Sequence, residues 1–311
     1  MNDHEAAETW RIARANWHPR MMAVVFAWLA LAVVALALGS VLPDALWLTV
    51  HFALLGAVTN ALFIWSWHFS GAILRIPDQA DRSAEVMRLS VLNIGIVGAA
   101  IGIPTEAVAV VVGGALFVAA AVLMHIAAIR AGMKRALPSP YAFTAHAYLY
   151  ASALLVVGLL LAGAIEMLQD SEALAERLLL AHVSVNLLGW VGIPIIGTIV
   201  TLWPTMLRTR IASHAARLAR KALPIAFVAT LVTAIGLAFW LRYIAAVGFL
   251  LYTTALVLVL QPMIAVLRQK RMASFATKSA ISGMAWIALA VPGFALTVVL
   301  VKDVESFVDH A

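Results

Sequence analysis

Long apolar runs separated by short polar breaks dominate the chain. A bilayer-spanning helix needs about 20 predominantly apolar residues, and most of these runs reach that length. Proline-containing breaks fall between runs, as at Pro43-Asp44 and Pro138-Ser139-Pro140. The pattern predicts an all-α, polytopic transmembrane helix bundle of about nine spans, at 21–42, 45–74, 88–104, 106–130, 141–165, 177–207, 222–241, 243–267 and 279–301.

The sequence outside the spans is short. Residues 1–20 mix acidic and basic side chains with Trp10 and Trp17, which indicates an interfacial segment on the cytoplasmic side and not a cleavable signal peptide. Residues 21–301 form the expected transmembrane domain, and 302–311 form a tail outside the membrane.

Composition agrees with the pattern and narrows the chemistry. Of 311 residues, 64% are hydrophobic and only 12% are charged, which is typical of a membrane protein. The chain contains no cysteine, so disulfides, thiolate metal sites, iron–sulfur clusters and c-type haem attachment are excluded. Any metal or haem must therefore be held by histidine, methionine, asparagine, tyrosine or carboxylate groups.

The distribution of positive charge predicts the orientation. Of the 21 Lys and Arg residues, 18 lie in residues 1–20, in the loops after alternate predicted spans, or at the span ends that adjoin those loops (Arg88 and Arg130). The positive-inside rule then places the N-terminus in the cytoplasm and the C-terminus outside, in a bacterial cytoplasmic membrane. The basic loop 208–221 is interpreted as an anchor facing anionic lipid, so the bilayer is the expected partner and nucleic acid is not.

Five histidines lie inside the predicted spans, and the orientation converts their positions into depths. His51 and His182 form an outer pair. His68, His125 and His146 form an inner trio near the cytoplasmic side, with His68 about 25 Å from His51 along one helix. The other histidines are expected to lie in tails or loops and to be solvated. They are His4, His18, His214 and His310.

Two imidazoles at one depth on different helices suit axial ligation of haem iron, because an apolar bundle offers a flat slot and neutral imidazole adds no charge. We therefore expect one or two haem b groups, with His51 and His182 as ligands. Three imidazoles at one depth suit copper or a second haem, so the inner trio is a second candidate metal site. The alternative is that these histidines only make hydrogen bonds within the bundle.

Other residues are candidates for the surroundings of these ligands. Asn186 lies one turn after His182, and Tyr150 lies one turn after His146. Arg75 and Arg130 are expected at the inner surface, where they can pair with haem propionates.

Small and aromatic residues add to this picture. Trp65, Trp67 and Trp203 are interpreted as an inner aromatic belt. Several glycines are expected to let helices or a macrocycle approach closely, namely Gly56, Gly95, Gly98, Gly102, Gly189, Gly192 and Gly197.

A short internal similarity links two of the spans. HFALLGAV (51–58) and SVNLLGWV (184–191) align on Leu-Leu-Gly with an offset of 133 residues. Both segments open spans that run inwards, four helices apart. This spacing is typical of parallel four-helix repeats.

The sequences HFALLGAVTNALFIWSWHF (51–69) and AHVSVNLLGWVGIPIIGTIVTLWPTMLRTR (181–210) resemble a known membrane domain. It is the domain that precedes the copper-binding domains of actinobacterial multicopper oxidases and copper nitrite reductase-like proteins. More remotely, the chain resembles the haem-copper oxidase subunit I and NnrS group. The resemblance implies a redox role, with His51, His68 and His182 as candidate ligands. Those relatives carry His-x-His in the second motif, where this chain has His182-Val183-Ser184.

The expected function is a haem-binding redox protein that moves electrons between the quinone pool and a haem or copper acceptor near the outer face. It would act as an oxidoreductase component. Expected partners are quinone, an extracytoplasmic copper protein and a second copy of the chain. The alternatives are copper or proton transport, metal delivery, haem handling, and a structural subunit whose histidines carry no function.

Overall fold

The computed structural model describes residues 17–76, 82–168, 171–270, 272, 274–301 and 303–304. Helices account for nearly all of these residues, and the described ranges contain no strand. Within them, nine helices are long and apolar enough to cross a membrane. The prediction of an all-helical, multi-pass membrane protein is therefore confirmed.

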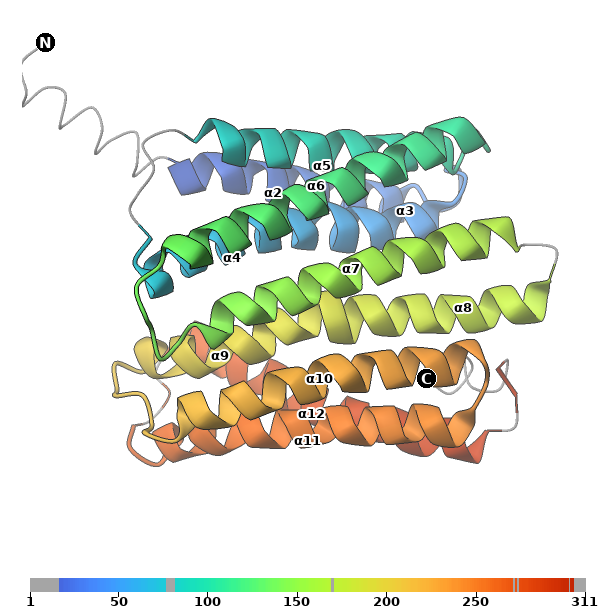
Figure 1. Ribbon diagram of the computed structural model, residues 1–311. Coiled ribbons are helices and arrows are strands. Elements are labelled where there is room, and N and C mark those ends of the chain that lie inside the picture. Colours follow the sequence, from blue (N-terminus) through green and yellow to red (C-terminus); the bar gives the residue numbers. More distant parts are fainter. Residues whose placement is uncertain are drawn as a thin grey trace, which may run out of the picture. The chain divides into compact units, whose positions relative to one another are not determined.

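The chain divides into two compact units, and each is described by itself (Figure 1). Unit 1 comprises Met1–Ala72 and Ile76–Lys134. Its second membrane helix is continuous but contains a π-helical stretch in its first half. The described helices of this unit are α2 (Trp17–Ala37), α3 (Ala45–His51), η1 (Phe52–Val58), α4 (Thr59–Leu74), α5 (Ser83–Gly102) and α6 (Val108–Arg135).

Unit 2 comprises Ile73–Arg75 and Arg135–Ala311. Its second membrane helix also contains a π-helical stretch. Helices α10 and α11 pack backbone to backbone, because Gly236 faces Ala245 and Gly248 faces Thr233. The described helices of this unit are α7 (Phe143–Met167), α8 (Glu172–Ser184), η2 (Val185–Gly192), α9 (Ile193–Met206), α10 (Ala215–Ala238), α11 (Arg242–Leu267) and α12 (Phe275–Leu300).

Several helices extend beyond the predicted spans into their charged flanks. α2 begins at Trp17, α5 at Ser83 and α10 at Ala215, each four or more residues before the predicted start. The apolar pattern marks only the length that lipid would cover. Backbone hydrogen bonds continue into the polar flank, where the helix still satisfies its own N–H and C=O groups.

The glycine-rich third span is explained by its packing on the fourth. A Cβ added to Gly95 of α5 would lie 2.7 Å from the carbonyl oxygen of Gly114 in α6, and one added to Gly114 would lie 2.8 Å from the carbonyl oxygen of Gly95. Gly98 and Gly102 face α6 in the same way. The small residues therefore let two helix backbones touch, as is usual between membrane helices.

The prediction that seven glycines let helices approach closely is also confirmed. At each of the seven predicted positions, an added Cβ would lie 3.0 Å or less from an atom of a neighbouring helix. In unit 2, the neighbour of Gly197 is Ala147, and the neighbour of Gly192 is the Tyr252 side chain. Protein atoms occupy the space that these glycines open.

Two adjacent glycines on α6 provide a matched test of the α5–α6 contact. Gly114→Val places methyl groups against the α5 backbone, and we expect it to destabilise the protein by about 1–3 kcal/mol, as overpacking usually does. Gly113→Val is the control, because no heavy atom lies within 4 Å of the added Cβ there. Thermal unfolding in detergent measures both. Equal losses of stability in the two variants would contradict the packing described.

The predicted orientation is testable because the chain has no native cysteine. Ser213, before α10, and Ser171, before α8, are both exposed. If the positive-inside assignment is right, Ser171→Cys in intact cells reacts with a membrane-impermeant maleimide and Ser213→Cys reacts only after lysis. The reverse pattern would invert the topology.

Candidate functional site

His182 is held by the helix beside it. The ring is half-buried near the end of α8, and its Nδ1 lies 2.9 Å from the carbonyl oxygen of Gly158 in α7. A carbonyl oxygen can only accept, so Nδ1 carries the proton and donates it. In the neutral ring, Nε2 is then the nitrogen with a lone pair for a metal. A backbone carbonyl on the other nitrogen is the usual means of orienting a metal-binding imidazole.

His51 in unit 1 has the same tautomer by a different route. Its Nδ1 lies 2.8 Å from the carbonyl oxygen of Trp47, one turn earlier in α3. The ring also stacks on the Trp47 indole, with 3.9 Å between the ring centroids. These two contacts fix the ring plane, and in the neutral ring Nε2 is then the nitrogen that carries the lone pair.

Both histidines stand at the start of a π-helical segment. η1 begins at the residue after His51, and η2 begins three residues after His182. These segments contain the two Leu-Leu-Gly sequences that align in the chain. π-helical turns are rare and occur frequently at functional sites. The short sequence similarity therefore coincides with an unusual backbone shared by the two segments.

The glycine in each of these sequences receives a large side chain from the preceding membrane helix. Gly56 faces the Trp28 side chain of α2, and Gly189 faces the Leu154 side chain of α7. A Cβ at either position would lie within 2.8 Å of that side chain. Leu-Leu-Gly is thus explained by close packing of the first membrane helix of each unit on the second.

Side chains donate hydrogen bonds to the π-helical backbone in both units. Asn60 Nδ2 lies 2.8 Å from the carbonyl oxygen of Gly56 in η1. In η2, the Tyr252 hydroxyl of α11 donates to the Leu188 carbonyl at 2.8 Å. Donors in these positions stabilise an irregular backbone where no water is available.

Asn60 belongs to a buried amide pair that the sequence analysis did not identify. Its partner is Asn93 of α5, with Asn93 Nδ2 2.8 Å from Asn60 Oδ1 and a reciprocal contact of 3.2 Å. Trp28 Nε1 also donates to Asn93 Oδ1, at 2.6 Å. The sequence does carry a signal for this pair. Asn93 is the one amide in the apolar run VLNIGIVG, and a polar residue inside a membrane span tends to have a partner within the bundle.

Asn186 supports His182 through the backbone. Its Nδ2 donates to the His182 carbonyl oxygen at 2.8 Å. The same amide lies against Gly158, where an added Cβ would be 2.7 Å away. The prediction that Asn186 shares a face with His182 agrees with this geometry, and both residues contact Gly158 of α7.

His125 is fully buried and is part of the packing between α4 and α6. Its Nε2 lies 2.8 Å from Ser66 Oγ, and its ring stacks on Phe63 with 4.3 Å between centroids. Its Nδ1 is buried without a hydrogen-bond partner. The side chain therefore does not extend to the membrane surface.

His68 is exposed and contacts a histidine that the sequence analysis had placed in a solvated tail. The His18 ring, near the start of α2, packs edge-on against His68 with 4.4 Å between centroids. It also stacks on Trp65 at 5.4 Å. The interpretation of His18 as simply solvated was wrong, because α2 begins earlier than predicted and brings the ring onto α4.

His146 lies in unit 2 near the start of α7 and is exposed. Its Nδ1 lies 2.9 Å from the carbonyl oxygen of Ala142, so this ring too offers Nε2. Tyr150 is one turn later, as predicted, and its ring packs on Phe227 at 5.1 Å. His68 and His125 lie in unit 1, so the predicted trio draws on both units and stays a prediction.

The two arginines proposed for haem propionates are both exposed. Arg75 follows α4 in a left-handed conformation, with φ 52°, and the next N–H bonds back to the Gly71 carbonyl oxygen at 3.0 Å. This arrangement is a Schellman-type helix end, formed here without the usual glycine. Arg130 lies near the end of α6.

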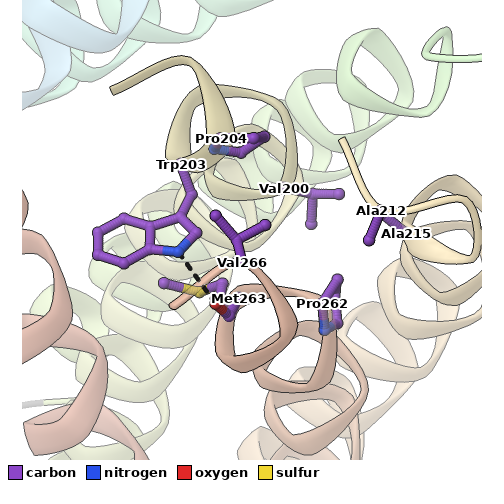
Figure 2. A pocket seen from close by; sticks show the side chains of 8 residues that line it. All are labelled: Val200, Trp203, Pro204, Ala212, Ala215, Pro262, Met263 and Val266. Carbon is purple, nitrogen blue, oxygen red and sulfur yellow. Dashed lines mark hydrogen bonds between the residues drawn. The ribbon is translucent and has the colours of Figure 1, made fainter. Parts of the chain in front are cut away.

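Trp203 is not part of an aromatic belt. The side chain is 0% exposed, and its Nε1 donates to the Met263 carbonyl oxygen of α11 at 3.1 Å (Figure 2). Beside it lies an apolar cavity of about 10 Å³, lined also by Pro204 and Pro262. That volume holds at most one water. The hydropathy pattern could not distinguish a buried tryptophan from an interfacial one.

The described helices and their two π-helical segments define the class of protein as an all-helical, multi-pass membrane protein. No protein-family model, curated protein or solved structure matches the chain. Among the described residues, no group of three or more His, Cys, Asp or Glu is placed to hold a metal ion.

The amide pair yields a test of the unit 1 site. Asn93→Leu leaves Asn60 Oδ1 and Trp28 Nε1 without their partner, and we expect a loss of about 1–3 kcal/mol in stability. Asn60→Leu should cost a similar amount. The double variant should cost clearly less than the sum, because the second change removes a group already unpaired. Unfolding in detergent measures all three, and strict additivity would show that the amides act independently.

Proposed function

We propose that this chain is a haem-binding redox protein of the membrane, with His51 and His182 as imidazole ligands. The observation that supports the proposal best is the shared arrangement of the two rings. Each donates Nδ1–H to a backbone carbonyl, which makes Nε2 the nitrogen with the lone pair in the neutral ring, and each lies at the start of a π-helical segment. An arrangement repeated in two units is unexpected for histidines that only fill space.

The donor set fits haem b. Neutral imidazole binds haem iron without adding charge to an apolar environment. When bound, haem supplies a one-electron couple. The protein residues orient the ligands: the Gly158 and Trp47 carbonyls fix the tautomers, and Asn186 fixes the backbone at His182. Arg75 and Arg130 are exposed and are proposed to pair with propionates.

The proposal includes the finer features of the expected architecture. Each unit carries its Leu-Leu-Gly π-helix in its second membrane helix, which supports two parallel four-helix repeats followed by α12. The orientation remains N-terminus in the cytoplasm and C-terminus outside, in a bacterial cytoplasmic membrane. His51 and His182 then lie toward the outer face, and electrons pass between quinone and a haem or copper acceptor there.

Absorption spectroscopy of the purified chain, expressed with ample haem precursor, tests this function. We expect the spectrum of six-coordinate haem b in the wild type, and iron in metal analysis. His51→Ala and His182→Ala should each lose an axial ligand, with loss of haem or a change of spin state. Added imidazole should restore the original spectrum, because it replaces the missing Nε2 donor.

The control is His214→Ala, which changes a histidine before α10 and should leave the spectrum unchanged. Haem content per chain in the two ligand variants tells whether the rings share one haem or serve two. If they share one, either variant affects all of the haem; if not, each affects half. A colourless wild type, or an unchanged haem content and spectrum in both variants, would refute the proposal. Copper without iron would favour the metal-transport alternative.

A further inference from the structure

A groove in unit 2 lies between the first turns of α7 and α10. Its volume is about 410 Å³, which is within the range of small-molecule sites. Four polar side chains line it, Ser139 from the segment before α7, His146 and Tyr150 from α7, and Arg220 from α10. Its apolar lining includes Phe143 and Leu223. A few polar groups on an apolar wall are typical of a site for an amphipathic ligand.

The polar groups offer both an acceptor and donors. His146 donates through Nδ1 to the Ala142 carbonyl at 2.9 Å, so its Nε2 is an acceptor in the neutral ring. Arg220 donates from Nη1 to the Pro140 carbonyl at 3.3 Å, and its remaining N–H groups can serve a ligand. Tyr150 packs on Phe227, which fixes the direction of its hydroxyl.

We propose that this groove binds the head of a quinone or quinol. The oxygens of a quinone accept from Arg220 and Tyr150, and the hydroxyl of a quinol donates to His146 Nε2. The flat ring fits the apolar wall beside Phe143. The alternative ligand, a lipid phosphate diester, presents only lone pairs to His146 Nε2, which also presents a lone pair in the neutral ring, whereas a quinol presents a hydroxyl proton, so the quinol satisfies His146 as well as Arg220 and Tyr150.

The inference rests on the proposed redox function and assigns His146 to quinone in place of a metal. A redox protein that exchanges electrons with the quinone pool needs a site for the quinone head. His51 and His182 are not in the lining of this groove. The quinone site and the haem ligands can therefore be tested by separate variants.

The test is a titration of the full-length protein, in nanodiscs of phosphatidylcholine, with decylubiquinone and separately with its reduced form, decylubiquinol, followed by quenching of tryptophan fluorescence. Arg220→Ala should weaken binding of both forms about tenfold through the loss of one hydrogen bond, and His146→Ala should weaken binding of the quinol by a similar factor while leaving the quinone unchanged. Tyr150→Phe should also weaken binding. The matched control is Arg217→Ala, which removes the same charge one turn earlier on α10, at an exposed residue outside the groove lining.

We expect quinone affinity to be the same at low and high salt, because the ligand is uncharged. Equal weakening by Arg217→Ala and Arg220→Ala would overturn the proposal, as would an absence of binding in the wild type. Salt-sensitive binding that phosphatidylglycerol displaces would assign the groove to a lipid phosphate and also overturn it.

The haem spectrum of the same samples separates the two proposals. His146→Ala should keep its haem while it loses quinol affinity. Haem without quinone or quinol binding would remove the groove assignment and leave the haem function intact. Quinol binding that depends on His146 and Arg220 in a protein without haem would refute the redox function and keep the groove.

Discussion

The need to satisfy backbone hydrogen bonds where water is absent governs this structure. Two long helices contain π-helical turns, which shift the regular hydrogen-bond register. In lipid, an irregular backbone is tolerated only where protein groups satisfy it. Asn60 and Tyr252 supply such groups from within each unit. Asn60 in turn is held by Asn93, so the amide pair of unit 1 serves this requirement.

Glycine also contributes to the π-helical turns, because it allows a neighbouring helix to pack closely against them. Gly56 and Gly189 allow Trp28 and Leu154 to lie directly against the π-helical backbone. Van der Waals contact of this kind is the main attraction between helices in lipid, where the hydrophobic effect no longer acts between them. The same principle explains α5 and α6, whose glycines meet at the backbone, and α10 and α11, where Gly236 faces Ala245 and Gly248 faces Thr233.

The hydrogen bonds of the histidines determine their tautomers. The tautomer in turn decides which ring nitrogen carries the lone pair. At His51, His146 and His182, a carbonyl oxygen accepts from Nδ1, so Nε2 carries the lone pair of the neutral ring each time. His125 differs, because its Nε2 bonds to Ser66 inside the α4–α6 contact and its Nδ1 has no hydrogen-bond partner. Histidines that seemed equivalent by depth, such as His125 and His146, therefore differ in their hydrogen-bond partners.

The sequence by itself determined the class and the spans of this protein, because hydropathy over about 20 residues reports directly on crossing a bilayer. It also marked Leu-Leu-Gly as a repeated feature and His182 with Asn186 as neighbours on one helix face. Only the tertiary structure decided which side chains meet across helices: the amide of Asn93 with that of Asn60, the ring of His18 with that of His68, and the burial of Trp203. Such contacts depend on how helices rotate and pack, and one-dimensional periodicity carries no information about residues far apart in the chain.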